Sequence, residues 1–249
     1  MASSAADPPV AEIAERLVRR ERMVTLAGVA ALVLSAWAWL AMGAQMSMSA
    51  SFAAVTAMWA VMMVAMMLPS GTPAILLYAR VKRSRGDATV APTWLFVAGY
   101  VIAWIGFSVA AAAAQLALVA SGAVGAMALR ITLPELAGAA LIVAGTYQLS
   151  PWKDACLSQC RSPAGFISRH WRPGAAGAVR LGLLHGAICV GCCWLLMALL
   201  FVGGVMNLAW VALLSALVAV EKIVPRGAAI GRAAGIVMIA AGVALIVAG

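Results

Sequence analysis

Methionine side chains are concentrated in one stretch of this sequence, at a spacing that suits a helix. Five of them fall within ten residues: Met58, Met62, Met63, Met66 and Met67. Side chains four residues apart lie above one another on a helix, so these thioethers would form one broad stripe. Methionine also fills gaps between helices without any chemical role. A thioether is, however, a soft ligand that suits Cu(I), so the stripe predicts a site for that ion.

Thiols and one imidazole are gathered in a second stretch, at His185, Cys189, Cys192 and Cys193. The spacing places the first three on one face of a helix, with Cys193 at its border. Buried cysteines often serve only as small hydrophobic residues. Three of them beside a histidine, which is costly inside a membrane unless it has a partner, instead favour a metal site. We expect Cu(I) as the ion, with another soft metal as the alternative.

Other sulfur atoms lie at positions where a metal would come in or leave. These are Met42, Met46, Met48, Cys156 and Cys160. The two cysteines are four residues apart, in a segment that we place on the cytoplasmic side. Thiols are kept reduced there, so metal capture is favoured over a structural disulfide. Nearby basic residues are expected to lower the pKa of both thiols.

The elements that must position these side chains follow from the composition. The chain has 249 residues, of which 65% are hydrophobic and 10% are charged. Soluble domains carry about 25% charged residues, so a soluble nucleic-acid-binding protein, a disordered tail and a secreted disulfide scaffold are excluded. The net charge of +9 comes from arginines and lysines in short stretches between apolar runs. We therefore predict an all-α fold, a polytopic transmembrane helical bundle in a lipid bilayer.

Segments of about 20 mostly apolar residues are long enough to cross a bilayer. Seven occur, near 24–42, 53–79, 93–119, 133–149, 180–202, 206–221 and 230–248. The sixth is short, so six spans with a re-entrant segment are the alternative. At its end, Glu221 and Lys222 are expected at the membrane interface. We expect residues 1–22 to form a cytoplasmic amphipathic arm and residues 23–249 to form one transmembrane domain. Within this domain, residues 150–176 are expected to form a cytoplasmic loop that contains Cys156 and Cys160.

Basic residues alternate between the predicted loops. The second, fourth and sixth connections are rich in arginine and lysine, whereas the first and fifth have none and the third has only Arg130. Positively charged loops stay on the cytoplasmic side, so we expect the N-terminus inside and the C-terminus outside. At about 1.5 Å per residue, Met62–Met67 and Cys189–Cys193 then lie at similar depth near the middle of the membrane. No sequence pattern decides whether the second and fifth spans are neighbours.

Several motifs resemble those of a known bacterial family. They are Met58–Ser70, Tyr147–Pro163, Gly182–Trp194, Gly204–Trp210 and the pair Glu221-Lys222. Together they resemble the predicted metal-binding integral membrane proteins grouped as domain of unknown function 2182, over most of the chain beyond the first span. The resemblance implies a multi-pass protein of the bacterial cytoplasmic (inner) membrane that binds a metal.

The leading hypothesis is a membrane protein that binds Cu(I) for transport, relay or cofactor insertion. The outer methionines would collect the ion, the two stripes would hold it, and the loop cysteines would pass it to or from a soluble partner protein. A membrane thiol-disulfide oxidoreductase that uses the cysteines is one alternative, and a non-catalytic assembly subunit of a membrane enzyme is another. The sequence has no paired carboxylates in a span, Ser-His-Asp set or phosphate-binding loop, so catalysis on an organic substrate is not expected.

Overall fold

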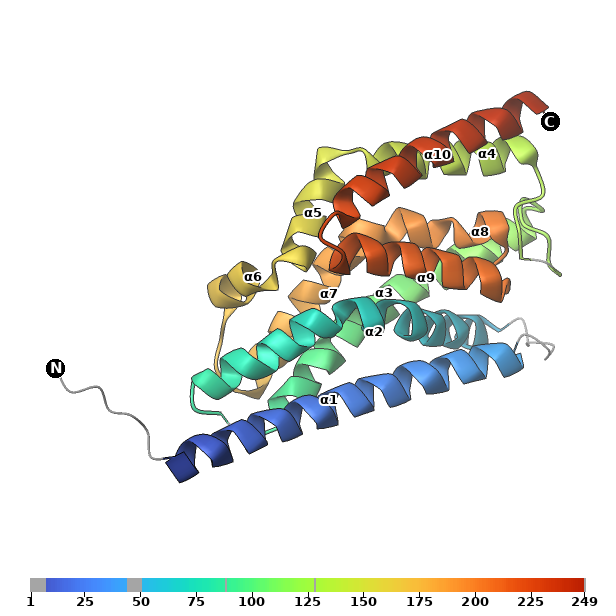
Figure 1. The fold of residues 1–249 in the computed structure, drawn as a ribbon. Coiled ribbons are helices and arrows are strands. Elements are labelled where there is room, and N and C mark those ends of the chain that lie inside the picture. Colours follow the sequence, from blue (N-terminus) through green and yellow to red (C-terminus); the bar gives the residue numbers. More distant parts are fainter. Residues whose placement is uncertain (1–7, 44–50, 88, 128, 249) are drawn as a thin grey trace.

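Helices make up the regular structure of the computed structural model, which describes residues 8–43, 51–87, 89–127 and 129–248, with side chains from residue 18 onward (Figure 1). The helices are α1 Pro8–Gly43, α2 Phe52–Ser84, α3 Ala91–Ala120, α4 Pro134–Gln148, α5 Pro151–Arg161, α6 Pro163–His170, α7 Gly174–Ala198, α8 Leu200–Gly203, α9 Leu208–Ile223 and α10 Gly227–Ala248. An isolated β-bridge joins Val124 and Ile131. The predicted all-α class is confirmed for the described part of the chain.

Helix starts are set by residues that satisfy free backbone groups. The side chains of Ser51, Ser150 and Asn207 precede α2, α5 and α9, and each accepts a hydrogen bond from a backbone N–H in the first turn. Such a cap stabilises a helix by about 1 kcal/mol. Proline occupies the first turn of α3, α4, α5 and α6, where its missing N–H has no cost. Polar residues and prolines between the apolar runs therefore fix where these helices begin.

Five helical segments are long and apolar enough to cross a membrane: Val18–Gly43, Phe52–Ser84, Ala91–Ala120, Gly174–Gly203 and Gly227–Ala248. They correspond to the first, second, third, fifth and seventh predicted spans. The fourth and sixth predicted spans correspond to α4 and α9, which are shorter, with 15 and 16 residues. The total of seven crossings and the sidedness of the termini therefore stay predictions.

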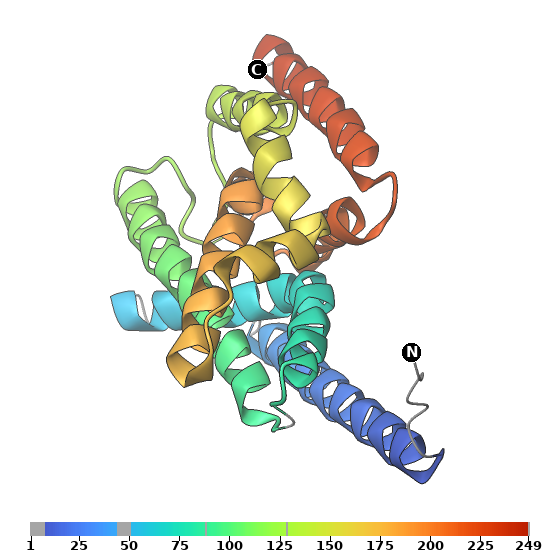
Figure 2. The same cartoon turned by 90° about the vertical axis from the view of Figure 1, so that its left-hand side faces the viewer.

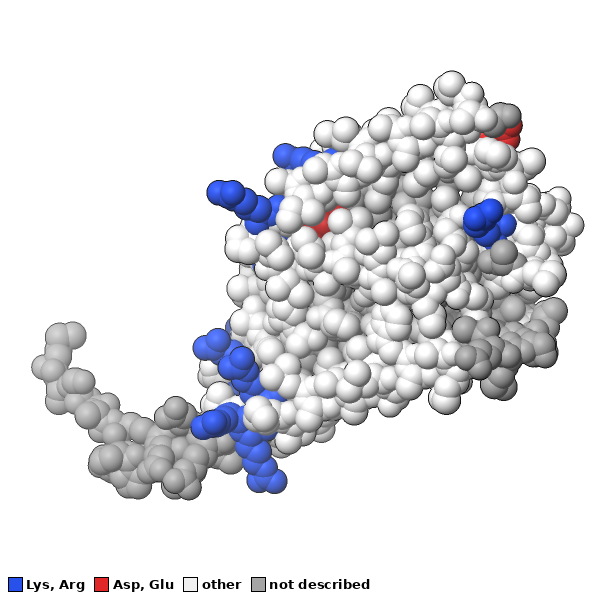
Figure 3. Space-filling view, turned by 45° about the vertical axis from the view of Figure 1, so that its right-hand side comes forward, with Lys and Arg blue, Asp and Glu red and all other residues white. Residues whose placement is uncertain are grey.

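Charge is distributed unevenly over the surface. Figure 3 shows arginine and lysine gathered mainly at one end of the bundle, with a largely uncharged surface beyond it. The links α2–α3, α6–α7 and α9–α10 lie at this end, whereas the start of α1 and the end of α10 lie at opposite ends (Figure 1). This is the pattern that a positively charged cytoplasmic side would produce.

The two segments predicted to lie outside the spans are largely helical. In the predicted loop 150–176, α5 and α6 bury Leu157, Phe166 and Ile167. α5 packs against α7, so the loop folds back onto the bundle. At the other end of the chain, α1 runs from its first residue to Gly43 without a break, so the helical part of the predicted arm is continuous with the first span.

The interior of the bundle lies between α2, α3, α7 and α9. α2 packs against α1, α3 and α9, whereas α7 packs most extensively against α3 and also against α5. α4 pairs with α10 at one edge of the molecule (Figure 1 and Figure 2). Because α2 and α7 share α3 as a neighbour, their side chains reach the same interior space.

Glycines allow α3 and α7 to approach closely. A Cβ atom on Gly182 of α7 would clash with the backbone O of Phe96, and one on Gly99 of α3 would clash with the backbone O of Val179. Small residues at such positions let helix backbones pack without intervening side chains. The glycines therefore fix the position of α7, and of its cysteines, against α3.

α2 changes direction along its length (Figure 2), and it contains Pro69 and Pro73. A proline inside a helix removes an N–H donor and bends the helix. Two carbonyls just before Pro69 accept hydrogen bonds from side chains. The Tyr100 hydroxyl donates to the O of Met67 at 3.0 Å, and the Ser215 hydroxyl donates to the O of Met66 at 3.3 Å. These bonds attach the methionine-bearing part of α2 to α3 and α9.

Candidate metal centre

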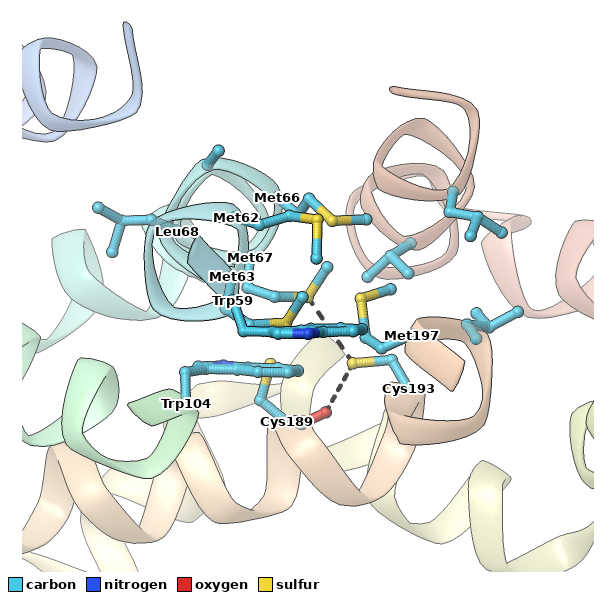
Figure 4. Close-up of a cluster of buried hydrophobic side chains, with 14 of the residues drawn as sticks. Trp59, Met62, Met63, Met66, Met67, Leu68, Trp104, Cys189, Cys193 and Met197 are labelled. Atoms are coloured by element: carbon cyan, nitrogen blue, oxygen red, sulfur yellow. Dashed lines mark hydrogen bonds between the residues drawn. The ribbon is translucent and has the colours of Figure 1, made fainter. Parts of the chain in front are cut away.

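The methionine stripe of α2 lies inside the protein. All five predicted methionines are at most 1% exposed. Figure 4 shows Met67 turned toward Cys193 of α7, with Met62, Met63 and Met66 on the same helix beside it. A stripe that faced lipid would be exposed on the surface of the isolated chain. The thioethers therefore face protein, as ligands for a buried ion would.

The cysteines of α7 meet this stripe at one point. The Cys193 thiol donates a hydrogen bond to the Met67 thioether, with 3.8 Å between Cys193 Sγ and Met67 Sδ (Figure 4). Cys189 and Cys192 lie on the same helix, and all three cysteines are 1% exposed. The second and fifth predicted spans thus touch through their sulfur atoms, which no sequence pattern could decide.

Met197 is a further buried sulfur side chain that the sequence patterns do not single out. It is 0% exposed and lies beside Cys193 and Trp59 in Figure 4. Its spacing of four residues from Cys193 is the signal that would have identified it. Trp59 and Trp104, which are also buried, lie beside the sulfur atoms. Their large apolar rings fill the space in which water would otherwise solvate the thiols.

The thiols of α5 reach the same region from the loop. Cys160 Sγ is 3.9 Å from Cys192 Sγ. Cys156 faces α7 at Gly191, where an added Cβ would lie 3.3 Å from Cys156 Sγ. All five cysteines of the chain are free thiols, and these two of α5 are only partly buried. The structure therefore brings the predicted loop cysteines to the cysteines of α7.

The loop thiols are harder to ionise than the sequence predicts. Burial raises the pKa of Cys156. Hydrogen bonds to the sulfurs of Cys189 and Cys192, and then burial, raise the pKa of Cys160. The expected lowering of both pKa values is wrong, because burial at Cys156, and hydrogen bonds and burial at Cys160, outweigh nearby positive charge. Lys153 is in addition paired with a carboxylate of α9. A metal that binds these thiols must therefore displace their protons.

A lysine side chain also enters the sulfur cluster. Lys222 Nζ donates to Cys189 Sγ at 2.9 Å and to Ser70 Oγ at 3.3 Å, and Lys222 is 8% exposed. Its neighbour Glu221 does not neutralise it, because that carboxylate pairs with Lys153 at 2.6 Å. The fold buries both side chains, so neither extends into water as an interfacial side chain would, and their depth in the membrane stays a prediction. The Lys222 charge is therefore directed at the thiols.

His185 lies one helical turn before Cys189, but its described contacts are aromatic. The centroid of its ring is 6.1 Å from that of Phe96, 6.0 Å from that of Tyr100 and 5.5 Å from that of Phe166. It is 3% exposed, and its Nδ1 atom has no hydrogen-bond partner in the described part of the chain. An unsatisfied ring nitrogen is able to accept a ligand. Its role as a metal ligand stays a prediction.

The outer methionines are not part of the described cluster. Met42 lies near the end of α1 and is 63% exposed. Met46 and Met48 lie outside the residues that the structure describes. Their role in collecting the ion stays a prediction.

Two sulfur pairs have the separation that a shared metal ion would impose. Sulfur atoms bound to one ion at about 2.3 Å each, in tetrahedral arrangement, are roughly 3.8 Å apart. Met67 and Cys193 are 3.8 Å apart, and Cys160 and Cys192 are 3.9 Å apart. Among the described residues, no group of three or more His, Cys, Asp or Glu is arranged to hold a metal ion. The sulfur pairs described above combine a thioether with thiols, and both kinds of sulfur atom are soft ligands.

One protein family matches most of the chain. The family model described as PpoB2: Copper chaperone matches residues 56–245, which include the α2 methionines and all five cysteines. The matched region begins after the outer methionines near the end of α1. No curated protein and no solved structure matches the chain.

Proposed function

We propose that this chain, which belongs to the PpoB2 copper chaperone family, is a membrane-embedded chaperone that holds Cu(I) between α2 and α7. The observation that carries the proposal is the 3.8 Å contact between Met67 Sδ and Cys193 Sγ, which joins the thioether stripe to the thiols. Family membership supports copper handling, and the soft donor set supports Cu(I) over harder ions. Five helices long enough to span a membrane support the location.

In this proposal copper is the cargo. It passes from Met58 along α2 to Met67, and from there to Cys193 and the other α7 thiols. Thiolates replace thioethers along this path, so the ion is held more tightly toward α7. Each thiol that binds the ion as thiolate releases one proton. Cys156 and Cys160 then pass the copper to a soluble acceptor protein, or receive it from a donor in the reverse direction.

Copper retention by the purified full chain tests the proposal. Protein in detergent, loaded with Cu(I) and freed of excess metal, is expected to keep near-stoichiometric copper. Met67→Leu is expected to lower the affinity, measured by competition with a Cu(I) chelator. Met127→Leu is the matched control, because Met127 is 98% exposed and far from the cluster in sequence. Metal-free wild-type protein after loading would contradict the proposal.

The Lys222 ammonium balances the charge of the bound site. Cu(I) with two thiolates has a net negative charge, which is costly in an apolar interior without a nearby cation. Lys222→Met is therefore expected to weaken Cu(I) binding about 10- to 100-fold, as for other groups that support metal ligands. Chelator competition measures this change, and Lys222→Arg, which keeps the charge, is the control. Wild-type affinity in Lys222→Met would rule out the charge-balancing role.

A membrane thiol-disulfide oxidoreductase is the second candidate function, favoured by the contact between Cys160 and Cys192. Their sulfur atoms, 3.9 Å apart, need only small side-chain movements to reach the disulfide length of about 2.05 Å. This function leaves the buried methionines of α2 without a role. Wild-type protein that binds no copper but loses two thiols on mild oxidation would support it. Wild-type protein that neither binds copper nor loses thiols on mild oxidation would support the assembly subunit.

A further inference from the structure

A cavity of about 630 Å³ lies between α1 and α2, at the end of the bundle where basic side chains gather (Figure 3). Its wall includes Arg22 and Glu21 of α1 and Arg80 and Arg83 of α2. Figure 1 shows α1 lying along α2. The cavity is therefore a gap between these two helices with charged side chains around it.

Among the side chains that the structure describes, positive charge exceeds negative charge around this cavity. Glu21 is already engaged by Lys82, at 2.7 Å, and by Arg83. Arg22 and Arg80 are exposed, and neither forms a hydrogen bond or ion pair with another residue that the structure describes. A guanidinium group binds phosphate oxygens through paired hydrogen bonds. The cavity therefore suits an anion that carries a phosphate.

An apolar groove continues from this cavity between the same two helices. It has a volume of about 500 Å³, and Leu76 lines both spaces. Leu26 and Val33 of α1 and Pro73 of α2 are among its lining residues. At about 1.5 Å per residue, Val33 lies about 17 Å from Arg22 along α1, close to half of a hydrocarbon core about 30 Å thick. The cavity and the groove together therefore have the length from a headgroup at Arg22 to the end of an acyl chain within one leaflet.

We infer that the cavity and the groove together bind one anionic phospholipid, with its phosphate at Arg22 and Arg80 and an acyl chain in the groove. Basic pockets between membrane helices recognise anionic headgroups, and the excess positive charge here selects against a zwitterionic lipid. Free phosphate would occupy only the cavity, whereas a phospholipid fits both spaces. The inference rests on the membrane location in the proposed function, and it is independent of copper binding.

Lipid binding by the detergent-purified full chain tests this inference. The protein is titrated with phosphatidylglycerol, phosphatidylcholine or inorganic phosphate, with bound lipid read by native mass spectrometry and all three probes read by thermal shift. Phosphatidylglycerol is expected to bind more tightly than phosphatidylcholine. Joint replacement Arg22→Gln and Arg80→Gln is expected to weaken phosphatidylglycerol binding about 10- to 30-fold. Arg172→Gln with Arg226→Gln removes the same charge from exposed positions outside the cavity, and should leave binding unchanged.

A variant of the groove distinguishes a phospholipid from free phosphate. Ala30 lines the groove, so Ala30→Trp fills it while leaving the arginines in place. This variant is expected to lose phosphatidylglycerol binding. Equal affinity for the two lipids, equal weakening by both arginine double variants, or binding of inorganic phosphate alone would overturn the inference. Copper retention measured on the same samples separates such a result from a failure of the proposed copper function.

Discussion

Joint replacement of Cys189, Cys192 and Cys193 by serine is expected to abolish copper retention. The loss should exceed the roughly 10- to 100-fold effect of a residue that only supports a ligand. Serine is close to cysteine in size, but its hydroxyl oxygen is a hard donor that Cu(I) does not favour. The change also removes the thiol that contacts Met67 at 3.8 Å. The thioethers alone would hold the ion too weakly to survive removal of excess metal.

The copper content of the protein after gel filtration measures this effect, and a thermal melt checks that the variant is folded. Cys156→Ser is the matched control, because Cys156 faces Gly191 and is only partly buried. We expect this control to keep its copper. Full copper content in the triple variant would place the ion elsewhere. Equal loss in Cys156→Ser would mean that the loop thiols hold it.

Glu221→Gln is expected to lower the free energy of unfolding by about 3–5 kcal/mol. The Glu221 carboxylate lies 2.6 Å from Lys153 Nζ, and both side chains are only 2% exposed. Its other oxygen accepts a hydrogen bond from Gln148 at 2.6 Å. Glutamine keeps the shape of glutamate but leaves the Lys153 ammonium buried without a counter-charge. Chemical denaturation of the full chain in detergent micelles measures the change.

Asp154→Asn provides the matched control for this experiment. It removes the ion pair between Asp154 and Arg232, which has a similar length of 2.7 Å but is 37% and 57% exposed. An exposed pair contributes about 0–1 kcal/mol, so this variant should be close to wild type in stability. If both variants lost the same stability, burial would not be what makes the Glu221 pair important.

The helical faces of the sulfur residues could be predicted because the period of a helix is fixed. Met62–Met67 and Cys189–Cys193 are each spaced to share a face, and both groups are buried in the structure. The estimate of equal depth also agrees with the contact between Met67 and Cys193. The long apolar runs predicted the all-α class for a similar reason, since such a run can be recognised without knowing which other segments pack against it.

Contacts between distant segments could not be predicted in this way. Cys160 and Cys192 are 32 residues apart, and they meet only because α5 folds back onto α7. The pair of Lys153 with a carboxylate 68 residues away helps to hold α5 there. The hydrogen bond from Lys222 to Cys189 likewise joins residues of two different helices, 33 positions apart in the sequence. In each case the partner is chosen by packing, which spacing along one helix does not reveal.

The five thiols differ in burial, and this difference has a consequence for the proposed release of copper. The three of α7 are buried, whereas Cys156 and Cys160 on α5 are partly exposed. A visiting protein would therefore meet Cys160 before any deeper sulfur, and that sulfur already lies beside Cys192. In the proposed function, copper would then be transferred by stepwise ligand exchange from one sulfur atom to the next, without a water-filled channel. The net direction of delivery would be set by the relative affinity of the visitor.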